Sequence, residues 1–288
     1  MIIRLFLIIL LAIPQWVHSQ GKETDLPVIW GIAKMTFLVS NFQVARDYYG
    51  RFLGFDEAFT YPSDLGPVIA FKINDRQFLE FVEDREAPAK NRLVSVSFET
   101  EDVEQMRNYL KYNGVNVPDK TSVDGAGNGV LLVQDPSGNP IEFIQYNAGG
   151  LHLGSRGRFL SEHRISGRIH HAGLYTGSIM DNDPFYTGIL HFREILRYPE
   201  DKSLAPIILY LGIGEGVENI EHYSPNDRDF SHPCFLVEDM QETIYTLKER
   251  RVNESLERPI IGKGGRWILN LRNSDQTRVE FTEGHRVR

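Results

Sequence analysis

Apolar residues recur along the chain in short runs from residue 31 to residue 282, and many of these runs are separated by Gly, Pro or Asn. Runs of this length predict β-strands, whose successive side chains point to opposite faces of a sheet. The run at 31–39 is followed by a helical pattern at 41–53 that ends at Gly54, and then by three more strand-like runs. We therefore predict one βαβββ unit at the start of the folded chain.

Similar successions of strand, helix and strands recur three more times along the chain. The second unit covers 93–146, the third covers 168–211 and the fourth covers 232–282. Between the third and fourth units lies an acidic and polar stretch at 212–230. Its length and polarity predict an inserted loop, of a kind that can cover a site.

An internal duplication relates the two halves of the chain. Lys34 and Ser95 are 61 residues apart, and so are His171 and His232. Both members of the second pair follow their counterparts by 137 residues. Repetition at a fixed offset indicates two copies of one structural unit.

The predicted fold class is therefore α+β, with two tandem domains that each contain two βαβββ units. The first domain is expected at 28–147 and the second at 168–284. The segment at 148–167 is rich in Gly, Arg and His, which is typical of a linker.

Three residues of the second copy are candidate metal ligands. His171, His232 and Glu280 each lie on a predicted strand, and each is expected on the face that does not pack under a helix. A single strand histidine is usually an ordinary surface or core residue. Two imidazoles and one carboxylate on neighbouring strands instead favour a facial metal site with open positions.

The first copy lacks this set of residues. Its corresponding positions hold Lys34, Ser95 and Glu142. A protonated lysine repels a cation and a serine hydroxyl is a poor ligand, so we expect no metal in this copy. Lys34 is expected to pair with Glu142 or with Glu80.

Two further residues near the candidate ligands receive a structural interpretation. Strand alternation places His170 on the helix-packing face, away from His171. Cys234 is the only cysteine of the chain, so no internal disulfide can form. A structural role is expected for its thiol, although a thiol two residues from His232 is also able to bind a metal.

Three motifs resemble the vicinal oxygen chelate superfamily, which includes glyoxalase I, bleomycin-resistance proteins and extradiol dioxygenases. They are YYGRFLGF at 48–55, DPSGNPIEF at 135–143 and IHHAGL at 169–174. The resemblance implies paired βαβββ units that form a curled sheet with a metal on its concave face. It also implies that the three candidate ligands match the ligand positions of the superfamily.

A first copy without metal and a second copy with two His and one Glu resemble the layout of type I extradiol dioxygenases. That resemblance implies Fe(II) or Mn(II), bound to a catechol-like compound and to O2. The run at 273–280 departs from the extradiol signature, however, because it lacks the Pro and Gly of its first-copy counterpart.

Two other classes of function remain open. One is a lyase or isomerase that uses a redox-inert metal such as Zn or Ni on a hydroxy-ketone or hemithioacetal. The other is a non-enzymatic protein that binds a small molecule between the two copies. The superfamily contains all of these classes, so the fold does not decide among them.

Three residues are candidates for positioning or acid/base catalysis. Tyr175 shares the face of His171, and Tyr210 is placed by our alignment at the position of Glu80. For both tyrosines, a role as ordinary aromatic residues that line the site is equally compatible with the sequence. His222 lies in the predicted insertion and is able to act from a lid, although a surface histidine is the simpler interpretation.

Composition narrows the class of partner. The 288 residues carry a formal net charge of −8, whereas nucleic-acid binding requires concentrated positive charge. We therefore expect a small-molecule substrate and no nucleic-acid partner. Domains of this superfamily pair within a chain or between chains, so a homo-oligomer remains open.

The N-terminus has the pattern of a secretory signal. A positive charge precedes an apolar run, and small residues follow it near Ser19. We predict a signal peptide at 1–19 and a periplasmic or extracellular location. The alternative is an uncleaved membrane anchor, but the apolar run is shorter than the roughly 20 residues that span a bilayer.

Overall fold

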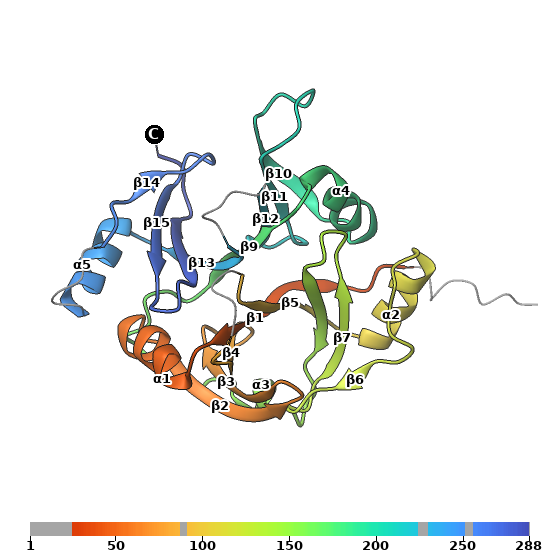
Figure 1. Ribbon diagram of the computed structural model, residues 1–288, viewed down its shortest axis with the longest axis horizontal. Coiled ribbons are helices and arrows are strands. Elements are labelled where there is room, and N and C mark those ends of the chain that lie inside the picture. Colours follow the sequence, from red (N-terminus) through yellow and green to blue (C-terminus); the bar gives the residue numbers. More distant parts are fainter. Residues whose placement is uncertain (1–24, 87–90, 224–229, 251–255, 288) are drawn as a thin grey trace, which may run out of the picture.

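The computed structural model describes residues 25–86, 91–223, 230–250 and 256–287. Its strands form two eight-stranded sheets, one in each half of the chain, with most of the helices on the outside (Figure 1). The predicted α+β fold with duplicated halves is confirmed. The predicted signal peptide at 1–19 lies outside the described residues.

The first half contains two βαβββ units. Its elements are β1 (Ile29–Val39), α1 (Phe42–Ala45), the wide-turn π-helix η1 (Arg46–Phe52), β2 (Asp56–Ser63), β3 (Gly66–Lys72), β4 (Phe78–Glu83), β5 (Leu93–Thr100), α2 (Val103–Tyr112), β6 (Ser122–Val123), β7 (Gly129–Gln134) and β8 (Pro140–Gln145). The helix that precedes Gly54 ends there because Gly54 has φ of 82°, which glycine adopts without steric cost.

The second half repeats this order after a linker that contains α3 (Leu151–Gly154). Its elements are β9 (Ile169–Tyr175), α4 (Ile179–Asp183), η2 (Pro184–Ile189), β10 (Arg193–Tyr198), β11 (Ile208–Gly212), β12 (Asn219–Tyr223), β13 (His232–Val237), α5 (Met240–Arg250), β14 (Ile260–Ile261), β15 (Trp267–Arg272) and β16 (Arg278–Glu283).

Both sheets have the same strand order. The first runs β2-β3-β4-β1-β5-β8-β7-β6, and the second runs β10-β11-β12-β9-β13-β16-β15-β14. In each half the opening strand pairs parallel with the fourth strand and antiparallel with the fifth. The strands that carry the candidate ligands are therefore neighbours at the centre of the second sheet.

Strand β12 corrects the prediction of an insertion at 212–230. Residues Asn219–Tyr223 form a central strand of the sheet and are buried. The sequence hid this strand because Asn219, Glu221 and His222 interrupt its apolar pattern. Residues 224–229 of the predicted insertion lie outside the described residues.

A β-bulge lies at the same place in both opening strands. In β1, Ile32 and Lys34 pair with consecutive residues of β5, so Ala33 is the extra residue. In β9, Ile169 and His171 pair with consecutive residues of β13, so His170 is the extra residue. A bulge turns its extra residue out of the regular alternation of a strand.

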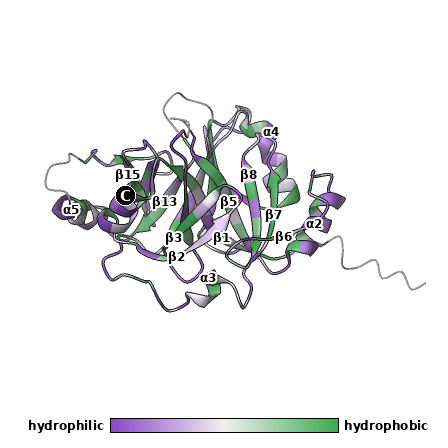
Figure 2. Ribbon diagram, turned by 60° about the horizontal axis from the view of Figure 1, so that its bottom comes forward, coloured by the Kyte–Doolittle hydropathy of each residue, from purple (hydrophilic) through white to green (hydrophobic). Residues whose placement is uncertain are grey.

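One hydrophobic core extends through both halves. The rings of Phe55 and Phe235 lie 5.1 Å apart between their centroids, and those of Phe98 and Phe192 lie 5.4 Å apart. Figure 2 shows apolar residues concentrated on the strands and polar residues on the outer helices. Among the described residues, no helix has the length and apolar character needed to cross a bilayer.

The linker helix α3 lies at one end of the first half, below its strands in Figure 2. It inserts His152, which is fully buried and stacks on the ring of Tyr146 at 4.8 Å. Two further rings, those of Phe59 and Phe78, contact His152 edge-on. The linker therefore fills the concave face of the first half.

Candidate metal centre

Four side chains with metal-binding atoms converge on the concave face of the second sheet. His171 comes from β9, Glu221 from β12, His232 from β13 and Glu280 from β16. One nitrogen or oxygen atom of each residue lies within 4.8 Å of the corresponding atom of the other three. The structure thus brings together all three ligands predicted from the sequence and adds Glu221.

The distances between these atoms are short but exceed those of strong hydrogen bonds. Nε2 of His171 lies 3.4 Å from Oε2 of Glu221 and 3.4 Å from Oε1 of Glu280. Nε2 of His232 lies 3.5 Å from Oε2 of Glu221. All four residues are buried, with at most 6% of their surface exposed.

The converging atoms have no hydrogen-bond partner. This holds for Nε2 of His171, Nε2 of His232, Oε2 of Glu221 and Oε1 of Glu280. A buried polar atom without a partner costs about 1–3 kcal/mol. Four such atoms directed at one another fit a bound cation, which would satisfy them together.

Three of the four side chains are held from outside the centre. Tyr210 donates its hydroxyl to Oε1 of Glu221 at 2.6 Å, and Arg278 donates to Oε2 of Glu280. Nδ1 of His232 lies 3.0 Å from the carbonyl oxygen of Phe230. Since a carbonyl only accepts, Nδ1 carries the proton and Nε2 keeps its lone pair for a metal.

The protonation of His232 and Glu221 suits metal binding, whereas burial raises the pKa of Glu280. Burial and the nearby Arg278 lower the pKa of His232 well below its ordinary value, so its imidazole is neutral. Burial alone would raise the pKa of Glu221, but the contact with His171 lowers it instead. A neutral imidazole and an ionised carboxylate are the forms that bind metals.

Glu221 is the ligand candidate that sequence reasoning missed. It lies opposite Gly173 in the sheet, as Glu80 lies opposite Thr36 in the first half. Glu221 therefore corresponds to Glu80, and the prediction that Tyr210 holds this position is wrong. The sequence hides this correspondence because β12 has a weak apolar pattern, and the 137-residue offset carries Glu80 to position 217, four residues before Glu221.

The three residues predicted for catalysis have different locations. Tyr210 contacts the centre directly, through Glu221 and through an edge-on ring contact with His171 at 5.6 Å. Tyr175 lies farther away, and its ring contacts Tyr223, which in turn contacts His232. Their catalytic roles remain predictions.

His222 does not lie in a covering loop. It is fully buried on β12, where strand alternation turns it away from its neighbour Glu221. Its ring packs against Tyr186 with centroids 4.5 Å apart, and burial lowers its pKa to about 3. The predicted lid position is wrong, and the surroundings of His222 are those of a core residue.

His170 is also corrected by the structure. The bulge in β9 places its Nδ1 atom 3.2 Å from Nδ1 of His171 and exposes its ring to the same pocket. Burial and the adjacent His171 lower the pKa of His170 to about 3. Regular strand alternation, on which the prediction of a helix-packing position relied, does not apply at a bulge.

Cys234 is fully buried, and burial raises the pKa of its thiol well above the ordinary value. Its Sγ atom lies within 4.8 Å of a ring nitrogen of His170 and of a ring nitrogen of His171. A buried, protonated thiol is inert, which is compatible with the predicted structural role.

The corresponding site of the first half is closed by ion pairs. Nζ of Lys34 lies 2.8 Å from Glu80 and 3.4 Å from Glu142, so both predicted partners are confirmed. Tyr61 donates to Glu80 at 2.6 Å, and Nε2 of His152 lies 3.0 Å from the same carboxylate. These charges compensate one another without a cation.

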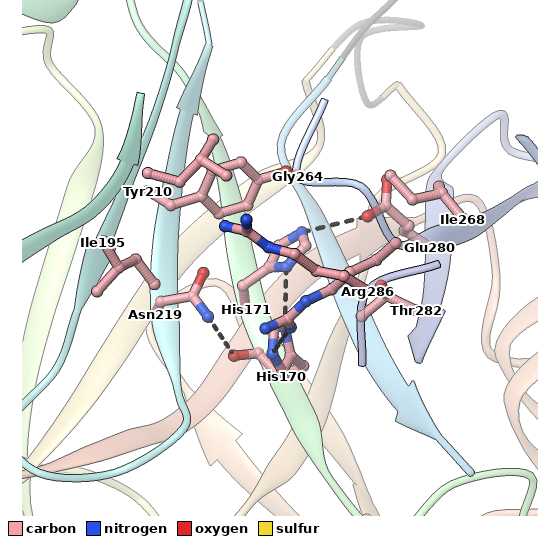
Figure 3. A pocket seen from close by; sticks show the side chains of 12 residues that line it. His170, His171, Ile195, Tyr210, Asn219, Gly264, Ile268, Glu280, Thr282 and Arg286 are labelled. Carbon is pink, nitrogen blue, oxygen red and sulfur yellow. Dashed lines mark hydrogen bonds and ion pairs between the residues drawn. The ribbon is translucent and has the colours of Figure 1, made fainter. Parts of the chain in front are cut away.

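A pocket opens beside the donors of the second half, as Figure 3 shows for His171 and Glu280. Its volume is about 120 Å³. The lining residues come from β9, β10, β11, β12, β15 and β16 and from the turn and tail near the C-terminus. The candidate centre is therefore accessible to a small molecule from one side.

Comparison with known families supports this assignment of the fold. Residues 31–143 match the family model described as the Glyoxalase/Bleomycin resistance protein/Dioxygenase superfamily. The resemblance to the vicinal oxygen chelate superfamily is thus confirmed for the first half. A comparison of the sequence with curated proteins finds no match.

Solved structures extend the similarity to both halves. The 2,3-dioxygenase LapB from Pseudomonas sp. KL28 aligns with a TM-score of 0.72 at 18% identity, covering 90% of this chain and 94% of that one. Homoprotocatechuate 2,3-dioxygenase from Arthrobacter globiformis aligns with a TM-score of 0.68 at 17% identity, covering 90% and 81%. At these identities the similarity shows a shared fold.

Proposed function

We propose that the protein is a metal-dependent enzyme acting on a small compound with vicinal oxygen atoms. One observation carries this proposal: four buried donor atoms, from His171, Glu221, His232 and Glu280, lack hydrogen-bond partners and converge on one point. Two imidazoles and two carboxylates suit Mn(II), Fe(II), Zn(II) or Ni(II). A divalent ion held there would supply Lewis-acid stabilisation of negative charge on substrate oxygens.

The residues of the chain hold this centre in place and keep it dry. Tyr210 orients Glu221, Arg278 orients Glu280, and the Phe230 carbonyl orients His232. Outer contacts of this kind fix the tautomer and the direction of metal ligands. The four donor residues are at most 6% exposed, and such burial strengthens the electrostatic interactions among them.

The number of donors favours a lyase or isomerase. A facial triad of two His and one carboxylate leaves room for a chelating substrate and O2 together. A fourth protein donor, Glu221, leaves fewer positions, enough for a chelating substrate alone. A redox-inert metal is sufficient for such a reaction.

A second candidate is an extradiol dioxygenase that uses Fe(II) or Mn(II). It is favoured by the fold shared with 2,3-dioxygenases over 90% of this chain. A solved complex of the homoprotocatechuate enzyme from Brevibacterium fuscum contains 3,4-dihydroxyphenylacetate, a catechol, and aligns with a TM-score of 0.66 at 18% identity, covering 90% of this chain and 82% of that one. A dioxygenase function requires that Glu221 does not bind the metal, so that one position stays open for O2.

We also propose that the protein works outside the cytoplasm. The charged, apolar and small-residue pattern at 1–19 supports this location. The test is N-terminal sequencing of protein recovered from the cell envelope and the medium. An uncut N-terminus in all fractions would exclude a cleaved signal.

The metal proposal is tested by elemental analysis of the purified full-length protein. We expect about one ion per chain in the wild type and large losses in His171→Ala, Glu221→Ala, His232→Ala and Glu280→Ala. Glu142→Ala is the matched control, because Glu142 occupies the position of Glu280 in the first half, and it should retain the ion. A wild type that takes up no divalent metal would refute the proposal.

The two reaction classes are separated by their consumption of oxygen. Catechol-dependent O2 uptake after loading with Fe(II) supports the dioxygenase. Exchange of a proton beside a carbonyl, without O2 uptake, supports the lyase or isomerase. Binding that is unaffected by His171→Ala, with no turnover, would leave a non-enzymatic binding protein.

A further inference from the structure

The pocket beside the metal donors has the size of a single aromatic ring. Its volume is about 120 Å³, comparable to the roughly 150 Å³ apolar cavity that accommodates benzene. His171 and Glu280 are among the residues that line it (Figure 3). A ligand that reaches the metal is therefore small.

Apolar side chains line two opposite sides of the pocket (Figure 3). Ile195 and Leu196 contribute from β10, and Ile268 contributes from β15 on the opposite side. These side chains favour a short hydrocarbon or aromatic body. They offer no partner for a polar group.

Two arginines line the rest of the pocket. Nη1 of Arg266 lies 3.0 Å from Nε2 of His170, and Arg286 lies among the side chains around His171 (Figure 3). In the part of the chain that the structure describes, neither guanidinium has an ion pair with Asp or Glu. Arg278, by contrast, is paired with Glu280.

The backbone ties these two arginines together. Arg266 closes a turn in which Gly262 donates to the carbonyl of Arg266 at 2.9 Å. The amide of Val287 donates to the carbonyl of Gly265 at 2.7 Å, which fixes the C-terminal segment that carries Arg286 against the same turn. The two guanidiniums are thus presented from segments that are joined to each other.

The charges of the site are unbalanced in favour of an anion. Glu221 and Glu280 compensate a divalent metal, so Arg266 and Arg286 leave the pocket with an excess of positive charge. Arginine forms forked hydrogen bonds with carboxylates, and such charge-assisted bonds are stronger than neutral ones. Two guanidiniums without an acidic partner therefore favour an anionic ligand over an uncharged one.

We propose, building on the metal-dependent function above, that the substrate is a small carboxylate. Its vicinal oxygens face the metal donors and its apolar body of about one ring lies between Ile195 and Ile268. Its carboxylate binds Arg266 and Arg286. These two arginines determine substrate specificity and need not take part in the chemical step.

The test compares two ligands that differ in charge and hardly in size. Full-length protein loaded with Zn(II) is titrated without oxygen by calorimetry, using 3,4-dihydroxybenzoate and the neutral 3,4-dihydroxybenzamide. We expect the wild type to bind the acid at least about tenfold more tightly. The Arg266→Gln/Arg286→Gln double variant should lose this preference while it binds the amide as before.

Two controls accompany this test. Lys263→Gln removes a positive charge from the same turn, but Lys263 stacks on Tyr198, outside the residues that line the pocket. It should keep the preference for the acid. Arg286→Gln alone alters an exposed side chain and should reduce the preference without affecting the fold.

The outcomes separate this inference from the function on which it rests. Equal affinity of the wild type for both compounds, or a preference that survives in the double variant, overturns the carboxylate proposal and leaves the metal centre standing. Bound Zn(II) with no binding of either compound also overturns it. A protein that binds no Zn(II), by elemental analysis of the same samples, refutes the metal centre itself.

Discussion

Gly173 provides the space that the imidazole of His232 occupies: a Cβ atom at Gly173 would lie 2.1 Å from Cε1 of His232. The two residues are direct partners across β9 and β13. In the first half the same positions hold Thr36 and Ser95, with the larger side chain on the other strand. His232, the candidate ligand, and the glycine opposite it therefore form a matched pair.

Gly173→Ala should displace His232 and weaken metal binding. Because the added methyl group cannot fit beside the imidazole, we expect a loss of affinity of at least about tenfold, as for other changes that misorient a ligand. Competition with a chelating dye measures this affinity. Gly177→Ala is the control, since a Cβ there meets no atom within 4 Å. Equal affinity of the two variants would show that His232 is not a ligand.

Tyr210→Phe should weaken metal binding without unfolding the protein. The variant loses the 2.6 Å hydrogen bond that holds Glu221, and such outer contacts contribute about 10- to 100-fold to affinity. Tyr245→Phe, at a tyrosine with 65% exposure, is the control. An unchanged metal affinity with a lower turnover rate would instead assign Tyr210 to the chemical step.

His152→Ala should destabilise the first half and leave the metal centre intact. The change removes buried aromatic packing and the contacts with Glu80 and Asn128, and we expect a loss of about 3 kcal/mol in the free energy of unfolding. Urea denaturation measures it, beside His163→Ala, an exposed histidine of the same linker. A parallel loss of metal from folded His152→Ala protein would contradict the separation of the two sites.

Acid should destabilise the first half through Glu80. Burial alone would raise the pKa of this carboxyl, but Lys34 and His152 lower it to about 2 from an ordinary 4.5. Since its folded-state pKa is depressed, its contribution is complete above pH 4.5 and is lost as the pH falls toward 2. That contribution is on the order of 3 kcal/mol.

The measurement is urea denaturation of metal-free protein between pH 5 and pH 2. Glu80→Gln should be less stable at pH 5 and should lose less stability on acidification than the wild type. Glu57→Gln, which breaks a surface pair with Arg46, should retain the wild-type slope. If Glu80→Gln also retains that slope, Glu80 is not the group that titrates.

The sequence was sufficient to predict the duplicated fold and three of the four donors. Lys34, Ser95 and their counterparts in the second half lie on strands whose spacing survives the duplication. Because both pairs differ by the same 137 residues, the offset alone identifies His171 and His232 as equivalent to Lys34 and Ser95. The Lys34 ion pairs followed from charge alone.

Glu221 and His170 escaped prediction for two different reasons. Strand β12 carries polar residues at Asn219, Glu221 and His222, so its apolar pattern is too weak to indicate a strand. His170 was mispredicted for another reason: it lies at a β-bulge, which changes the direction of a side chain and has no signature in the sequence. Only pairing with β13, a long-range contact, reveals it.

The linker helix α3, with His152, affects how the protein responds to its ligand. Because His152 and the Lys34 ion pairs fill the first concave face, that face offers no second site to communicate with the one in the other half. Ligand titration of a single chain should therefore follow a simple hyperbola, without cooperativity between the duplicated halves. On the proposed function, the duplication has produced one half that supports the fold and one that holds the site.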